Sequence, residues 1–395
     1  MERYFPQAEF EARWAKVHAG LRAKGLASAV VWGRSGGTYE RSGDVLYLTG
    51  YYGTHSGQGL DTPITTARSF ASVILRDGQP PELMADEPGP NPALLATERV
   101  GWSRNTIQGT AEVVNRLGLK GRVGFVGSDF FPIKYWDAFK AATPGVEWVI
   151  VDDLVRDARR IKSARELEAI RQGGRIAGRA LSRLIENLIA EIAAAEAAGE
   201  AAREVVRGGG HVHMIPVNHG ELIHYFTRDP LAGYSHDAPK PGDLVRGWVY
   251  GPMFQGYWLD PGRTAVAGRR ASNAQKNLIE ACAGIVEALI ADIRPGVRLM
   301  DLAEKGQRML ADAGAEKDQA AEKWPLFGHG VGLFFEKPYI STSMGSPDDV
   351  FEEGMVMGVE AFVAHAGVGS AGFEQNVIVG KSGAEVVTDA PMFWW

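Results

Sequence analysis

Along the N-terminal part of the chain, segments with apolar residues at helical spacing alternate with segments whose apolar residues have the pattern of β-strands. Residues 7–25 carry apolar side chains at helical spacing, and the later runs are typical of strands. The pair Asp77-Gly78 separates two of these runs and predicts a β-hairpin turn. The predicted strands are SAVVWG (28–33), the hairpin FASVILRDGQPPELMAD (70–86), RVGFVG (122–127) and VEWVIVDD (146–153). Helical patterns lie between them, so we expect an α/β domain over residues 1–157.

A long helical pattern opens the remainder of the chain. Ser163 and Glu166 have the spacing of a capping box, which marks the start of a helix. The apolar residues that follow on one helical face are Leu167, Ile170, Ala177 and Leu181. We place the domain boundary just before this helix, which predicts a second domain over residues 158–395.

The second domain contains a weak internal repeat. LIENLIAEI (184–192) and IVEALIADI (285–293) match almost position for position, and each precedes a second helical segment. Chance similarity between two helices rich in Ala, Leu and Ile would explain the match. Duplication of a unit with two helices and several strands would explain it equally well.

Acidic residues interrupt strand-like runs of the second domain. Glu360 lies in GMVMGVEAFV and Glu374 in SAGFEQNVIVG. A buried carboxylate is costly unless it is paired or binds a metal, although a half-exposed strand would avoid that cost. In GDLVRGWVYGPMFQGYWLDPGRTAVAG, a turn around Pro252 predicts a hairpin. Side chains alternate between the two faces of a strand. Trp248 and Tyr250 should therefore share one face of the hairpin's first strand, and Trp258 and Asp260 one face of its second strand.

Histidines supply the other candidate chemistry. His329 lies between glycines in FGHGVGLFFEKPYIS, and with three carboxylates it would suit manganese, iron or zinc. The adjacent Phe334 and Phe335 are either core residues or a box for a cationic or flat apolar substrate. HVHMIPVNHGELIHYF contains four histidines, His211, His213, His219 and His224. We expect His224 to lie on a strand that lines the site and to act as an acid or base, whereas the others could form a polar edge.

Composition narrows the class of protein. The chain of 395 residues has a formal net charge of −6 and no basic stripe, which disfavours nucleic-acid binding. Its sequence predicts no membrane span and no secretory signal. Cys282 is the only cysteine and lies in an apolar helical pattern, so we expect a buried thiol and a cytoplasmic protein.

Seven segments, in this order, resemble the creatinase/prolidase/methionine aminopeptidase superfamily. The segments are YLTGYYG (47–53), RIKSARELEAIR, IHYF, GDLV…GYWLDPGRT, GHGVGL…EKP, GMVMGVE and GFEQNVIV. The resemblance implies an α+β chain: a creatinase-type N-terminal α/β domain, then a pita-bread domain with a duplicated, mainly antiparallel sheet backed by helices. It implies His224 as a catalytic histidine, and as metal ligands Asp260, His329, Glu360 and Glu374.

The chain departs from this family pattern at three places. The first ligand aspartate of the metallopeptidases aligns with Trp248, which cannot bind a metal, so we expect one ion instead of two. Many relatives have a second histidine where this chain has Glu336, which joins the predicted catalytic residues. In other details the chain resembles the dimethylsulfoniopropionate lyase branch. That branch, however, has an acidic residue at the position where this chain has Phe335, and another near the position of Tyr250.

The resemblance implies a hydrolase that cleaves a C–N bond in a small amino-acid-like substrate, with Glu360 and Glu374 moving protons around one Mn, Fe or Zn ion. Three alternatives stay open: a metal-free creatinase-type hydrolase, a lyase acting on a small zwitterion, and a non-catalytic binding module. The resemblance also implies a homodimer in which a loop with Tyr52 and His55 closes the partner's pocket. Arg68 would bind a substrate carboxylate there, and Trp248, Tyr250, Phe334 and Phe335 would line the pocket.

Overall fold

The structure is a computed structural model that describes residues 3–35, 41–53, 61–62, 64, 66–225, 229, 233–316 and 326–395. The predicted site residue His55 lies outside these described residues. The chain forms two compact units, Met1–Arg159 and Arg160–Trp395.

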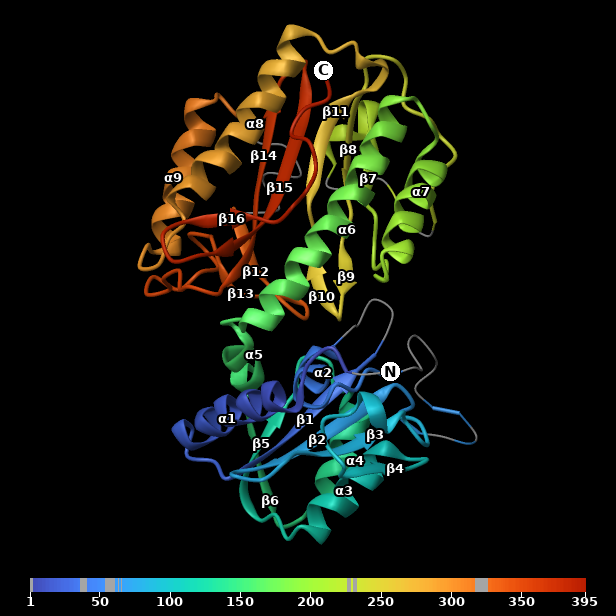
Figure 1. The fold of residues 1–395 in the computed structure, drawn as a ribbon, viewed down its shortest axis with the longest axis vertical. Helices are drawn as coiled ribbons and strands as arrows, with labels where there is room; N and C mark the ends of the chain where they lie inside the picture. Colours follow the sequence, from blue (N-terminus) through green and yellow to red (C-terminus); the bar gives the residue numbers. More distant parts are fainter. Residues whose placement is uncertain are drawn as a thin grey trace. The chain divides into compact units, whose positions relative to one another are not determined.

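The first unit is built on a mixed sheet with the strand order β4-β3-β2-β1-β5-β6 (Figure 1). Its strands are β1 (Ser28–Arg34), β2 (Phe70–Arg76), β3 (Glu82–Ala85), β4 (Val100–Trp102), β5 (Gly121–Val126) and β6 (Val146–Ile150). Its helices are α1 (Gln7–Ala23), α2 (Gly43–Thr49), the 3-10 helix η2 (Pro92–Leu94), α3 (Thr106–Arg116), α4 (Ile133–Ala142) and α5 (Asp153–Arg159). β2 and β3 pair antiparallel on either side of Asp77-Gly78, which confirms the predicted hairpin.

The second unit has two successive helix pairs and a larger, antiparallel sheet (Figure 1). The helices are α6 (Ala164–Ile189), α7 (Ala194–Arg207), α8 (Asn273–Asp292), α9 (Leu299–Asp312) and the 3-10 helices η3 (Gly220–His224) and η4 (Ala267–Arg269). The strands are β7 (Val217–His219), β8 (Leu244–Trp248), β9 (Gly251–Phe254), β10 (Tyr257–Leu259), β11 (Gly262–Val266), β12 (Gly328–Val331), β13 (Phe335–Tyr339), β14 (Val356–His365), β15 (Gly369–Val379) and β16 (Ala384–Val386).

The sheet order in this unit is β13-β12-β14-β15-β11-β8-β7, and β16 pairs with β15. Ser163 and Glu166 make both hydrogen bonds of the capping box, so α6 begins where the sequence predicted. The two repeated nonapeptides lie at the ends of α6 and α8, and each is followed by a second helix. This placement agrees with duplication of a helix-pair unit.

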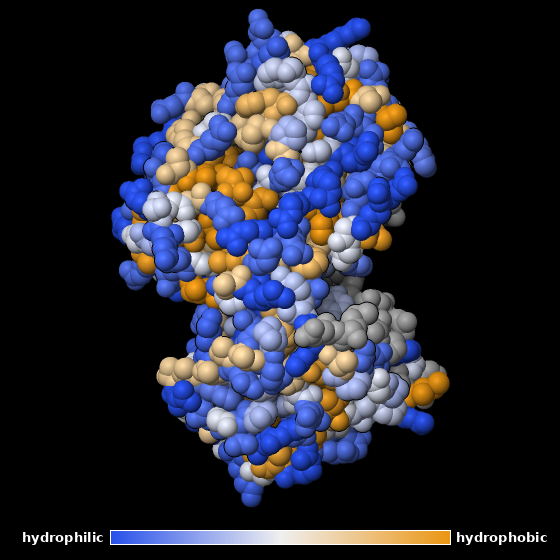
Figure 2. Space-filling view, viewed as in Figure 1, coloured by the Kyte–Doolittle hydropathy of each residue, from blue (hydrophilic) through white to orange (hydrophobic). Residues whose placement is uncertain are grey.

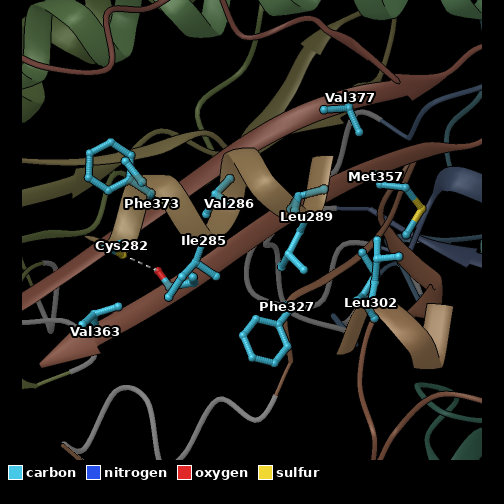
Figure 3. Packing of buried hydrophobic residues seen from close by; sticks show 14 of the residues in the cluster. Cys282, Ile285, Val286, Leu289, Leu302, Phe327, Met357, Val363, Phe373 and Val377 are labelled. Carbon is cyan, nitrogen blue, oxygen red and sulfur yellow. Dashed lines mark hydrogen bonds between the residues drawn. The ribbon is translucent and has the colours of Figure 1, made fainter. Parts of the chain in front are cut away.

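Helices α8 and α9 cover one face of the central strands with a continuous apolar core (Figure 3). Cys282 lies in this core, and its Sγ is 3.3 Å from the Ala361 carbonyl oxygen, so the expectation of a buried thiol is confirmed. Fully burying one Leu, Ile, Val or Phe side chain contributes roughly 1.5–3 kcal/mol, so this core fixes β14 and β15 firmly. Their other face is left to carry the polar residues of the site.

Two local predictions are wrong. Pro252 lies inside β9, and the turn of the β9–β10 hairpin is at Gln255 and Gly256, which adopt φ values of 53° and 84°. Two successive residues with positive φ are typical of tight two-residue hairpin turns. His224 lies in η3 and not on a strand, because Gly220 has a φ of 61° and turns the chain out of β7.

Among the residues that the structure describes, no helix is both long and apolar enough to cross a bilayer. The face shown in Figure 2 mixes hydrophilic and hydrophobic residues over each unit.

Candidate functional site

Four strands of the second unit bring the predicted ligand residues together. Glu360 on β14 and Glu374 on β15 are directly opposite each other, and both are buried. His329 on β12 pairs with Gly358 of β14, two residues from Glu360. Asp260 lies two residues before Gly262, which is the β11 partner of Glu374. Strands distant in sequence thus place three carboxylates around one imidazole.

Short distances connect these groups. His329 Nε2 lies 3.3 Å from Asp260 Oδ2, 3.7 Å from Glu374 Oε1 and 3.9 Å from Glu360 Oε1. The side-chain amide of Asn376 donates to Asp260 Oδ1 at 2.5 Å and fixes the orientation of that carboxylate. The imidazole of His329 is therefore surrounded by acidic oxygens.

The charges in this group perturb one another strongly. Burial opposes the charged form of His329, but the neighbouring Asp260 carboxylate outweighs it and raises the pKa of the imidazole to about 9. Burial also disfavours the Asp260 anion, yet the charge of His329 and its hydrogen bond lower the pKa of that carboxyl. Burial and the charges of Asp260 and Glu360 raise the pKa of Glu374 well above its usual range. Without an added cation, protons must compensate the buried carboxylates.

The donor set fits a divalent cation. One ligand atom from each of Asp260, His329 and Glu374 lies within 4.8 Å of the other two, and all three residues are buried. Glu374 Oε1 is buried without a hydrogen-bond donor, so its lone pairs remain available. Oxygen and imidazole ligands suit manganese, iron or zinc. A cation here would replace the protons that otherwise neutralise the carboxylates.

Trp248, which the family resemblance aligns with a further ligand aspartate, lies directly beside Glu374. Its indole Nε1 donates to Glu374 Oε2 at 2.8 Å, and its ring stacks on Phe362 with centroids 5.5 Å apart. A Cβ at Gly262 would lie 2.1 Å from the indole Nε1, and one at Gly372 would lie 2.7 Å from the ring. The indole therefore fits only because β11 and β15, the next two strands of the sheet, carry glycine where it crosses them.

The ligand residues open onto a cavity of about 240 Å³. Twelve residues line it: Pro216, Trp248, Tyr250, Asp260, Leu326, His329, Phe335, Tyr339, Met344, Glu360, Phe362 and Glu374. Burial raises the pKa of Tyr250, so its hydroxyl stays protonated, and it lies 2.9 Å from Met214 Sδ. The cavity lining thus combines the acidic and imidazole groups with five aromatic side chains.

Some lining residues escaped the sequence prediction. Phe362 follows Glu360 by two positions on β14, so strand alternation alone could have placed it on the same face. Tyr339 stands four positions after Phe335 on β13, and the same argument applies to it. Leu326 and Met344 lie outside strands, and no periodic pattern signals them.

Several predicted site residues lie apart from the cavity lining. Phe334 packs edge-on against Trp258, with ring centroids 5.0 Å apart. Glu336 is buried and forms an ion pair with Lys162 at 3.0 Å. His224 is exposed on η3. Tyr52, which is 40% exposed, and Arg68, which is partly buried, belong to the first unit.

Comparisons with known proteins agree with this geometry. A protein of Mycobacterium tuberculosis described as "Probable dipeptidase PepE" is 32% identical over 254 residues, which span 62% of this chain and 63% of that protein. The chain thus matches somewhat less than two thirds of that relative's length.

Solved structures share the fold over nearly the whole chain. An Xaa-Pro dipeptidase from Bacillus anthracis superposes with a TM-score of 0.76 at 19% identity, covering 97% of this chain and 98% of that one. Dipeptidase PepE from Mycobacterium ulcerans gives 0.73 at 25% identity, covering 98% of both chains. The expected pita-bread fold with a preceding N-terminal domain is therefore confirmed.

The family model described as "Metallopeptidase family M24" matches residues 168–381, more than half of the chain. This range includes all four predicted ligand residues and the strands that carry them. The protein belongs to metallopeptidase family M24.

Proposed function

We propose that the protein is a hydrolase that cleaves the C–N bond of an amide or peptide in a small amino-acid-like substrate. The observation that carries this proposal is the buried group of Asp260, His329 and Glu374 in the lining of a 240 Å³ cavity. Strongly perturbed titratable groups in a cavity are typical of catalytic sites. Family membership and the dipeptidase descriptions of the relatives support the same class of reaction.

We further propose that these three residues, with Glu360 beside them, hold one divalent ion. When bound there, such an ion would polarise the substrate carbonyl and lower the pKa of a water molecule. Trp248 restricts the site to a single ion, because an indole nitrogen donates a hydrogen bond and offers no lone pair. Manganese, iron and zinc all suit the donor set.

Protons move through the carboxylates in this proposal. Water adds to the carbonyl carbon, the C–N bond breaks, and the leaving nitrogen takes up a proton. Glu360, 3.9 Å from His329 Nε2, accepts the proton of the attacking water. Glu374, directly opposite Glu360 on β15, passes this same proton on to the leaving nitrogen, so both carboxylates return to their starting state. Asp260 remains ionised and holds His329 in place.

We retain His224 as a proposed acid–base group at the edge of the site. Its segment is anchored on both sides: Ile223 is buried, and the Tyr225 carbonyl accepts hydrogen bonds from Asn218 and Arg246. η3 packs against β8 and β15, the strands of Trp248 and Glu374. This anchoring supports a defined position for an exposed imidazole.

A metal-free hydrolase of the creatinase type is the second candidate. This candidate is favoured by the contact between His329 and Asp260, in which the imidazole already pairs with one of the carboxylates without a metal ion. Elemental analysis of protein purified without chelator separates the two candidates. We expect about one transition metal per chain, loss of that metal in Glu374→Gln, and its retention in Glu385→Gln, a change at the exposed ion pair with Arg171. Full dipeptide hydrolysis by metal-free protein would favour the second candidate.

We also propose a homodimer, as the family resemblance implied, with Tyr52, His55 and Arg68 near the partner's pocket. Tyr51, which is buried beside Tyr52, donates its hydroxyl hydrogen bond to Asp86, and this anchors the start of that segment. Light scattering should give twice the mass of one chain at micromolar concentration. A monomer that hydrolyses substrate would contradict the shared pocket.

A further inference from the structure

The charges of the groups that line the cavity are unbalanced. Among the described residues that line it, three are carboxylates, one is a histidine, and none is lysine or arginine. Three carboxylates exceed the charge of a single divalent ion. The lining groups themselves therefore keep an excess negative charge even when the proposed ion is bound.

The nearest buried guanidinium groups are already engaged elsewhere. Arg246 donates to the Ser370 hydroxyl and the Tyr225 carbonyl. Arg263 donates to the carbonyls of Pro391, Gly262 and Glu374 and to the Gln375 side chain. Neither arginine lines the cavity. A substrate carboxylate would therefore meet acidic oxygens there and no free guanidinium among the described residues.

Aromatic rings form most of the remaining wall: Trp248, Tyr250, Phe335, Tyr339 and Phe362. The Phe335 ring lies edge-to-face with Tyr250 at 5.8 Å and with His329 at 5.1 Å. The protein already places one cation against this wall, since the Arg246 guanidinium lies 5.8 Å from the Trp248 ring and 5.4 Å from the Phe362 ring. Aromatic faces within about 6 Å attract cations.

We propose that the aromatic part of the cavity binds an organic cation, an ammonium or guanidinium group, and rejects a carboxylate. The inference rests on the proposed function in one respect, that the cation belongs to the substrate whose amide bond is cleaved. The substrate class is then a cationic amide without a free carboxylate next to the scissile bond. Electrostatic attraction to the carboxylates and to the aromatic faces acts in the same direction.

A pair of unreactive ligands of equal shape tests the cation preference directly. Choline and 3,3-dimethylbutan-1-ol differ in the charge on one central atom. Isothermal titration of the metal-loaded protein should show choline binding about 3- to 30-fold more tightly. Equal or tighter binding of the neutral alcohol overturns the proposal.

Variants locate the bound cation. Phe335→Leu and Phe362→Leu should each lower choline affinity several-fold and change the affinity for the alcohol little. Phe393→Leu, at an exposed ring that does not line the cavity, is the matched control and should leave both affinities unchanged. Circular dichroism establishes that each variant is folded. If one variant does not fold, the other still tests the site, and unchanged choline affinity in a folded variant overturns it.

A matched substrate pair tests the rejection of carboxylates. Phenylalanyl-prolinamide should be cleaved with a kcat/KM at least about tenfold above that of phenylalanyl-proline, and equal values overturn this half of the proposal. Choline preference without any amide hydrolysis would instead refute the proposed function and leave the cation site standing. Hydrolysis of both peptides without choline preference would refute the cation site and leave the proposed function standing.

Discussion

The indole of Trp248 donates a hydrogen bond to Glu374, with Nε1 2.8 Å from Oε2. This contact uses one oxygen of the carboxylate and leaves Oε1 turned toward Asp260 and His329. In the proposed one-ion site, this side chain thus blocks a second ligand position and orients a ligand of the first.

Trp248→Asp should admit a second ion. The shorter carboxylate frees Glu374 Oε2 and adds an oxygen donor where the indole stood. Elemental analysis should give about two metals per chain after incubation with Mn²⁺, against one for the unchanged protein. Trp248→Phe, which removes the N–H without adding a ligand, should keep one. A single ion in Trp248→Asp would show that bulk from another residue closes the second position.

The metal-free protein should lose stability as pH rises from about 5 to 9. The pKa of His329 is raised to about 9, so its contribution is complete below its ordinary value of 6.5 and is lost as pH passes through 9. Glu374 acts in the same direction, because its raised pKa makes ionisation costly above its ordinary value of 4.5. The lowered pKa of Asp260 adds stability only above its ordinary value of 3.8, so it does not oppose this trend.

Urea unfolding at a series of pH values, with and without Mn²⁺, measures this effect. Bound metal should flatten the profile, because it replaces the protons in the site. Glu374→Gln should also reduce the slope in metal-free protein. A metal-free profile that rises toward pH 9 would contradict the assigned directions.

His224→Ala should reduce turnover by about 10²–10⁴-fold, the usual size of general acid–base catalysis. The melting temperature should change little, because the His224 side chain is exposed. His211→Ala, at another exposed histidine, is the matched control. Unchanged turnover in His224→Ala would assign proton transfer to Glu360 and Glu374 alone.

Breaking the Lys162–Glu336 pair should destabilise the second unit by about 3–5 kcal/mol, because one buried charge would remain uncompensated. Lys162→Met and Glu336→Leu should each show this loss in urea unfolding. The double variant should recover most of it. Additive losses in the double variant would show that the two side chains act independently.

The sequence predicted the strand-borne part of the site well. Glu360 and Glu374 interrupt apolar strands, and from the sequence either a buried pair of carboxylates or half-exposed strands would explain them; the structure buries both and places them directly opposite each other. The β2–β3 hairpin and the start of α6 followed from equally local signals, Asp77-Gly78 and the capping box.

Other features depended on tertiary contacts that no spacing reveals. The ion pair of Glu336 with Lys162 joins residues 174 positions apart, and no local spacing indicates it. The turn at Gln255 was missed because Pro252 is a stronger turn signal than glutamine. Leu326 and Met344 reach the cavity from irregular segments, where neither helical nor strand periodicity applies.

The two glycines beside the Trp248 ring would make the proposed loss of a ligand difficult to reverse by small steps. Any side chain at Gly262 or Gly372 collides with the indole, and the indole excludes an aspartate from its own position. These three positions should therefore vary as a set among homologous chains. A tryptophan aligned with Trp248, together with both glycines, would mark a lineage that has given up the two-ion site.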